Sequence, residues 1–318
     1  MMHRCLVISL LLWNTFVGVD YVEAYDFLTH AQVSQQAFDQ SARLRSYLED
    51  VGIKLDHVFD PDNTARQSAA FANFDNAGTV RDWLAAGAIR EDDYRRHRGL
   101  ESLFGCPPPP NPQSAQEQID RPIHHFFDVQ RGGTGLTLVG GLPAREWALG
   151  LQRRGPTPGQ NHFSLYDARV YQVRSLTERD RVERDRNAAS LFRTLGQVLH
   201  VLQDMAQPQH TRNDPHFGCT GTVLEFVAGE KSWYEVYTET RAKNEFYRSR
   251  GDAARPLVLS GYGPVGFHAY GDYWANAEGS GLAEFSSRNF FSAGTNLGTF
   301  YLAGPCGEIG RASCRERV

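Results

Sequence analysis

Residues 186–210 have the sequence RNAASLFRTLGQVLHVLQDMAQPQH, which is the clearest helical pattern in the chain. Apolar residues recur in it at the spacing of one helix face, and a proline closes the pattern. These positions are Leu191, Leu195, Val198, Leu202 and Met205, with Pro208 as the stop. We therefore predict a helix from Arg186 to Gln207 that packs its apolar side into a core.

Metal-ligating residue types lie beside the apolar stripe of this helix, in the order His200, Asp204 and His210. Because residues four apart share a helix face, His200 and Asp204 can direct an imidazole nitrogen and a carboxylate to one point in space. Gly196, one turn earlier, leaves room for an ion or for a close neighbouring element. His210 follows the end of the helix, where it can serve a second ion. The pattern predicts a metal site.

The rest of the chain also favours helices. Helical spacing appears over residues 29–51, 80–86, 232–243 and 281–291, and we find no convincing strand with period-two alternation and no internal repeat. The glycine-rich stretch 131–136 lacks the spacing of phosphate-binding loops, so we predict a turn there. We expect a mainly α fold built as a single multi-helix domain.

Composition limits the function classes. With 318 residues and 41% hydrophobic content, the chain can bury a sizeable core. Its formal net charge of -4 argues against a broad basic face for duplex nucleic acid. An anionic substrate would have to be held locally, for instance by metal ions.

The N-terminus has the features of a secretory signal peptide. A basic start through Arg4 precedes an apolar stretch from Cys5 to about Val19, which is shorter than the roughly 20 residues of a membrane span. Residues 22–24, Val-Glu-Ala, then resemble a cleavage site. We expect residues 1–24 to be removed, Tyr25 to begin the mature chain, and the protein to be secreted or periplasmic.

The far end and the cysteines complete the domain prediction. Residues 308–318 look like a translated sequencing adapter, so we expect the natural protein to continue differently beyond about Gly307. We assign residues 25–245 to one helical domain and 246–307 to its continuation. Outside the signal and this tail remain Cys106, Cys219 and Cys306, which allow one disulfide but are too sparse to form the metal ligand set.

Further nitrogen and carboxylate donors lie far apart in the sequence. They are His30, Asp92, and the pair His124 and His125 ahead of Phe126, Phe127 and Asp128. Such donors without thiolates suit zinc. They form one centre only if helix packing brings them together.

Three segments resemble the bacterial zinc-dependent phospholipases C and the related single-strand-specific nucleases. Segment 195–216 has that family's spacing of histidine, aspartate and histidine. Segment 121–128 resembles the family's histidine followed by two aromatics and an aspartate, which favours His125 over His124 as a ligand. Segment 24–30 ends in His30, five positions after Tyr25, where the family has tryptophan as its first mature residue. The resemblance covers roughly residues 25 to 240.

This resemblance implies a helical zinc phospholipase C type fold with a cluster of about three zinc ions at the bottom of a cleft. The implied ligands of one ion are Asp92, His125, His200 and Asp204. Asp204 would bridge to another ion, which His30 and the amino group and carbonyl of Tyr25 would also hold.

The remaining ion would take His210, a second histidine and an acidic residue. The family usually has the last two four apart on one helix, and no such pair follows His210 here. His216 is the best second histidine, and the acid is Glu235 or Glu225. We favour Glu235, although Ser232 and Glu235 also form a capping-box pattern.

The implied activity is hydrolysis of phosphate esters by a metal-activated hydroxide, with Asp92 and Asp204 as catalytic residues. Expected partners are a phospholipid or another phosphodiester substrate, with transient contact to a membrane surface. Two alternatives stay open. One is a single-strand nuclease on the same metal core, and the other is a non-catalytic, zinc-stabilised protein that binds a lipid or a partner.

Overall fold

The computed structural model describes residues 27–59, 78–92, 121–137, 140–151, 161–214, 238 and 266–290. Several predictions fall outside these residues. They concern the signal peptide, Tyr25, the three cysteines Cys106, Cys219 and Cys306, the ligand candidates His216, Glu225 and Glu235, nearly all of the helix expected over 232–243, and the tail 308–318.

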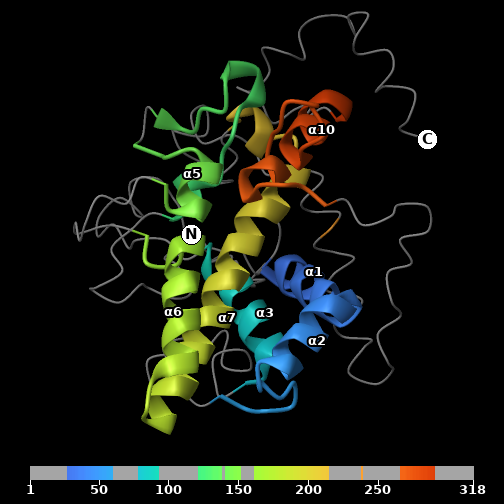
Figure 1. The fold of residues 1–318 in the computed structure, drawn as a ribbon. Helices are drawn as coiled ribbons and strands as arrows, with labels where there is room; N and C mark the ends of the chain where they lie inside the picture. The colour runs from blue at the N-terminus through green and yellow to red at the C-terminus, as the bar shows by residue number, and fades with distance from the viewer. Residues whose placement is uncertain are drawn as a thin grey trace, which may run out of the picture.

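The long helix α7 (Arg181–Gln203) runs through the centre of the molecule, as Figure 1 shows. Helices α3 (Val80–Arg90) and α6 (Leu165–Thr177) pack along it, and α1 (Phe27–Gln40) packs on α3. The short helix α2 (Ala42–Asp50) follows α1. Helix α5 (Ala144–Leu149) contacts α7. Helix α10 (Leu282–Asn289) packs on the turns that follow the end of α7.

Those turns are short 3-10 segments, η4 (Asp204–Ala206) and η5 (His210–Arg212). Three more segments of this kind are η1 (Arg121–His124), η2 (Val129–Arg131) and η6 (Tyr270–Tyr273). No strand occurs among the described residues, where the β-structure amounts to two isolated bridges. The prediction of a mainly α fold is confirmed for this part of the chain.

The central helix begins earlier than predicted and ends earlier as an α-helix. Asp180 caps its first turn by accepting a hydrogen bond from the Glu183 backbone N–H at 3.0 Å, so the helix starts at Arg181 rather than Arg186. At the other end the chain tightens into η4 from Asp204, ahead of Pro208. The last predicted turn is thus 3-10, a common helix ending.

The prediction of a single helix over residues 29–51 is wrong, because the segment is divided at Ser41 into α1 and α2. The Ser41 hydroxyl accepts a hydrogen bond from the Leu44 N–H at 3.3 Å and so caps a new helix. Two helices, α5 and α6, were not predicted. The glycine-rich stretch is a turn as expected, with Gly132 and Gly133 at φ of 73° and 79°.

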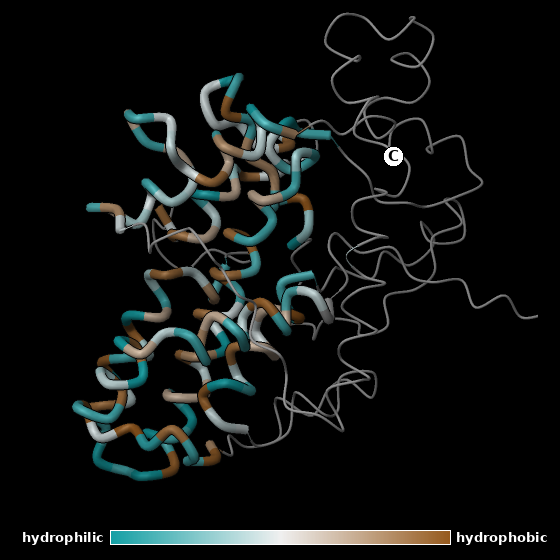
Figure 2. Tube along the Cα trace, turned by 90° about the vertical axis from the view of Figure 1, so that its right-hand side faces the viewer, coloured by the Kyte–Doolittle hydropathy of each residue, from teal (hydrophilic) through white to brown (hydrophobic). Residues whose placement is uncertain are grey.

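Two hydrophobic clusters share α7. The first gathers around Phe38, Trp83 and Phe192, and the second around Trp147, Met205 and Trp274. Figure 2 shows apolar residues scattered along the helices among hydrophilic ones. No described helix has the length and apolar character that crossing a bilayer requires. The end of α7 that carries His200 lies where the two clusters meet, since Leu199 packs in the first and Val201 in the second.

Helices α3 and α7 cross in backbone contact at a pair of glycines. A Cβ placed on Gly196 would lie 2.1 Å from the Leu84 carbonyl oxygen, and one on Gly87 would lie 1.9 Å from the Arg193 carbonyl oxygen. Both distances are far below van der Waals contact, so this approach requires glycine on each helix. The crossing brings the C-terminal end of α3 beside His200.

Candidate metal centre

Six buried imidazole and carboxylate residues gather around the end of α7. They are His30, Asp92, His125, His200, Asp204 and His210, and none is more than 5% exposed. They come from α1, the turn after α3, the segment after η1, α7, η4 and η5. Residues separated by up to 180 positions in the sequence thus form one polar cluster inside a hydrophobic interior.

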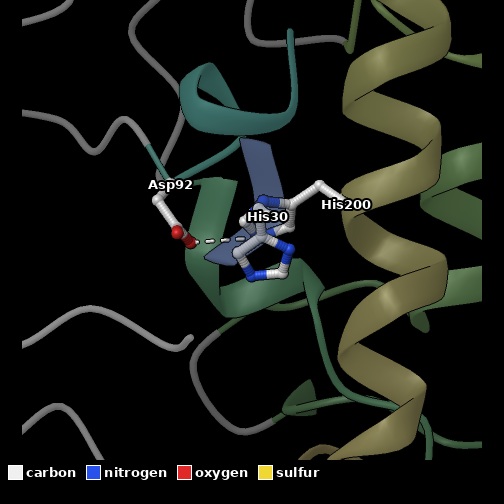
Figure 3. Close-up of side chains that lie close together, drawn as sticks. All are labelled: His30, Asp92 and His200. Atoms are coloured by element: carbon white, nitrogen blue, oxygen red, sulfur yellow. Dashed lines mark ion pairs between the residues drawn. The ribbon is translucent and has the colours of Figure 1, made fainter. Parts of the chain in front are cut away.

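Two groups in this cluster can hold a metal ion by their geometry. His30, Asp92 and His200 form one, and His125, His200 and Asp204 form the other. Within each group, one ligand atom per residue lies within 4.8 Å of the others. Figure 3 shows the first group, in which the rings of His30 and His200 stack at 3.6 Å and Asp92 lies beside them with its carboxylate directed at His200.

Asp204 lies between the imidazoles with its two oxygens directed differently. Oδ1 is 3.4 Å from His30 Nε2, whereas Oδ2 is 3.0 Å from His125 Nδ1 and 3.3 Å from His200 Nε2. Asp92 approaches the same two rings, with Oδ1 at 3.2 Å from His200 Nε2 and 3.6 Å from His125 Nδ1. Asp204 therefore faces imidazoles of both metal-binding groups.

Three of the histidines are oriented by oxygen atoms behind them. Nδ1 of His200 lies 2.5 Å from the Ala88 carbonyl oxygen, and Nδ1 of His210 lies 2.9 Å from that of His125. Nδ1 of His30 lies 2.7 Å from Oε1 of Gln203. Because these oxygens only accept, each Nδ1 carries the proton and the neutral ring keeps its lone pair on Nε2. This arrangement is typical of histidines that bind metals.

Several atoms of the cluster are buried without a hydrogen-bond partner in the described structure. They are Oδ2 of Asp92, both carboxylate oxygens of Asp204, Nδ1 of His125 and Nε2 of His200. Leaving one such atom unsatisfied costs about 1–3 kcal/mol. Because these atoms face one another at ion-pair distances rather than being scattered, a cation among them would satisfy several at once. The residues present fit a metal.

The pKa values of the cluster residues are shifted by burial and by their neighbours within the cluster. Burial lowers the pKa of His30. Burial also opposes protonation of His200, but Asp92 and Asp204 outweigh it and raise the pKa of His200 well above its ordinary value. Burial alone would raise the pKa of Asp204, yet the imidazoles of His210 and His200 hold it well below its ordinary value. Without a metal, the negative charge of Asp204 is stabilised by its histidine neighbours.

The structure separates the neighbours His124 and His125. The His124 ring stacks on Trp147 at 3.9 Å, and its Nδ1 accepts the Leu142 backbone N–H at 2.7 Å. Burial, with the charges of His125 and Arg121, lowers the pKa of His124 to about 3. His124 thus packs outside the cluster, while His125 lies within it.

His210 is a fully buried member of the cluster but belongs to neither metal-binding group among the described residues. Its ring stacks with Phe126 at 4.6 Å and lies 6.2 Å from the His125 ring. The further ligands expected with it, His216 and Glu235 or Glu225, lie outside the described residues, as does Tyr25.

Sequence reasoning missed two polar side chains that support the cluster, Gln203 and Glu91. Gln203 accepts from His30 and donates to the Ser34 hydroxyl at 2.9 Å. Its position three residues after His200 on one helix face was a usable signal. Glu91 is the neighbour of Asp92 at the end of α3, where helical periodicity no longer indicates direction.

No protein-family model, no curated protein and no solved structure matches the chain.

Proposed function

We propose that this protein is a zinc-dependent hydrolase of phosphate esters, of the phospholipase C type. The observation that carries the proposal is the buried cluster in which Asp204 faces His30 with one oxygen, and His125 and His200 with the other. A bridging carboxylate between imidazole-rich groups suits adjacent divalent cations. The sequence motifs shared with zinc phospholipases C and single-strand nucleases support the same function.

Zinc is the proposed metal because of the donor set. The described cluster offers four imidazoles and two carboxylates, and neutral imidazole favours zinc over magnesium or calcium, which prefer oxygen. His30, Asp92, His125, His200 and Asp204 would hold two ions, and His210 would contribute to a third. The ligation by Tyr25, His216 and Glu235, and the cleft above the cluster, stay predictions.

The metal and the residues of the cluster would have different roles in hydrolysis. Bound zinc would neutralise phosphate oxygens and lower the pKa of a water molecule from about 16 towards about 7. Asp92 presents an oxygen without a hydrogen-bond partner in the described structure, so it can orient the attacking water or accept its proton. Asp204 would keep His30 on one side, and His125 and His200 on the other, at a fixed spacing. Gln203 and the Ala88 carbonyl keep His30 and His200 turned towards the cluster.

For the substrate we propose a phospholipid ahead of single-stranded nucleic acid. The formal net charge of -4 does not suit a long polyanion, which proteins usually bind through a basic groove. A lipid head group carries a single phosphodiester, which a local metal cluster can hold. Export of the protein, expected from its N-terminus, would place it where it meets membrane surfaces.

We expect the purified protein to hydrolyse phosphatidylcholine vesicles faster than single-stranded DNA, and to lose this activity when a chelator removes its metal. Released head group and nucleotides would be measured in parallel, with zinc returned after chelation as the control. Faster cleavage of DNA would instead favour the nuclease. Bound zinc without hydrolysis of either substrate would favour a zinc-stabilised binding protein.

Zinc binding should strengthen as the pH rises. Burial opposes the charged form of His125 and His200, but their carboxylate neighbours outweigh it and raise both pKa values. These imidazoles therefore stabilise the metal-free fold below the unfolded pKa of about 6.5, and that stabilisation is lost as the pH rises through their folded pKa values. Zinc competes with the same protons.

We accordingly expect a larger rise in Tm on zinc addition at about pH 8 than at about pH 5.5. Zinc at roughly 100 times its Kd would add about 2.7 kcal/mol of stability. Thermal unfolding with and without zinc, in matched buffers, checks this. An equal rise in Tm at both pH values would contradict binding through these histidines.

A further inference from the structure

Glu91 is the most firmly held carboxylate near the cluster, yet it does not face the cluster's centre. Its Oε2 accepts from Arg121 Nε at 3.1 Å and Nη2 at 2.6 Å, and its Oε1 accepts from the Trp147 indole N–H at 2.6 Å. Arg121 also donates to Asn161 at 3.0 Å. Both oxygens of Glu91 are therefore engaged, which distinguishes it from its neighbour Asp92.

Glu91 is 1% exposed, and its Oε2 forms an ion pair with the Arg121 guanidinium at 2.6 Å. An ionised carboxylate accepts hydrogen bonds and donates none. Any donor that approaches Oε1 thus meets a fixed negative charge.

His125 lies between this carboxylate and the cluster. Its Nε2 is 3.6 Å from Glu91 Oε1, and its Nδ1 is 3.0 Å from Asp204 Oδ2. The other three histidines of the cluster direct Nδ1 outward to a neutral oxygen. His125 has the reverse orientation, with Nε2 outward, and the group behind it is charged.

Resting on the proposed function, we infer that Glu91 is a positioning residue for His125: it attracts the Nε2 proton and so turns the Nδ1 lone pair towards the metal cluster. A charged acceptor behind a histidine also increases the electron density on its ligating nitrogen. Arg121 and Trp147 fix the carboxylate for this role. We assign Glu91 no step in the reaction itself.

The alternative is a purely structural ion pair between Glu91 and Arg121, so the test must measure zinc rather than stability alone. Glu91→Gln keeps the shape of the side chain and removes its charge. We expect its zinc affinity, measured by competition with a chromophoric chelator, to fall about 10- to 100-fold. Asp167→Asn is the matched control, because Asp167 is a buried carboxylate that caps α6 through Ser164 and belongs to neither metal-binding group.

The control should lose stability and keep its zinc affinity. If Glu91→Gln bound zinc as tightly as the unchanged protein, the inference would be wrong, whatever happened to its Tm. This readout does not depend on hydrolysis. Tight zinc binding that weakens in Glu91→Gln, in a protein that cleaves no phosphate ester, would sink the proposed function and leave the role of Glu91 in place.

A second measurement needs no change at Glu91, in case Glu91→Gln fails to fold. Nitrogen-15 NMR of the zinc-loaded protein reports which ring nitrogen of each histidine carries the proton. We expect the proton of His125 on Nε2 and those of His30, His200 and His210 on Nδ1, with the His125 signal assigned by its loss in His125→Gln. A proton on Nδ1 of His125 would overturn the inference.

Discussion

Replacing Asp204 by Asn should abolish hydrolysis and lower the zinc content of the protein at the same time. The two oxygens of Asp204 face different imidazoles, so its negative charge lies close to members of both metal-binding groups. Asparagine keeps the size of the side chain, but it removes the negative charge and replaces one oxygen by an NH₂ donor that repels a cation. Since changing a mere supporting residue costs 10- to 100-fold in affinity or activity, we expect a loss of more than about 100-fold here.

Zinc per protein, measured by elemental analysis, and turnover of phosphatidylcholine vesicles would be determined on the same samples. Asp185→Asn is the matched control, because Asp185 lies on the same helix and pairs with His57 at 3.3 Å in a partly exposed position. Normal zinc content and full turnover in Asp204→Asn would show that Asp204 does not bridge metal ions.

The residues of α7 show how much of the fold the sequence could predict. Its apolar stripe and Pro208 were sufficient to predict a helix with His200 and Asp204 on one face, since helical spacing fixes which residues share a face. The caps were less visible. The side chains of Asp180 and Ser41 each accept one backbone hydrogen bond and so begin a new helix. Apolar periodicity does not show where a side chain will cap the backbone in this way.

The contacts between segments were beyond prediction from spacing alone. Nothing in the order Glu91, Asp92, Asp93 indicates that Glu91 turns to Arg121 while Asp92 turns to His200, because that choice depends on how α3 crosses α7. The resemblance to zinc phospholipases C suggested that His30, His125 and His200 converge. It gave no reason to expect Gln203 or Glu91 behind them.

The helix crossing that directs these residues rests on two glycines, Gly87 and Gly196, and we expect Gly196→Ala to damage the fold severely. Its Cβ would lie 2.1 Å from the Leu84 carbonyl oxygen and 2.9 Å from the Gly87 Cα. Because both are backbone atoms, no side-chain rotation relieves the overlap, and the helices must separate.

Separation would withdraw the Ala88 carbonyl from His200 and shift Asp92 away from the cluster, so stability and zinc affinity should fall together. Overpacking typically costs 1–3 kcal/mol, and with no flexible neighbour we expect about 3 kcal/mol or more for Gly196→Ala. Urea unfolding of the metal-free protein measures the first effect, and chelator competition the second. Gly266→Ala is the control, since a Cβ there meets nothing within 4 Å. If both variants were equally stable, α3 and α7 could not cross in backbone contact at Gly196.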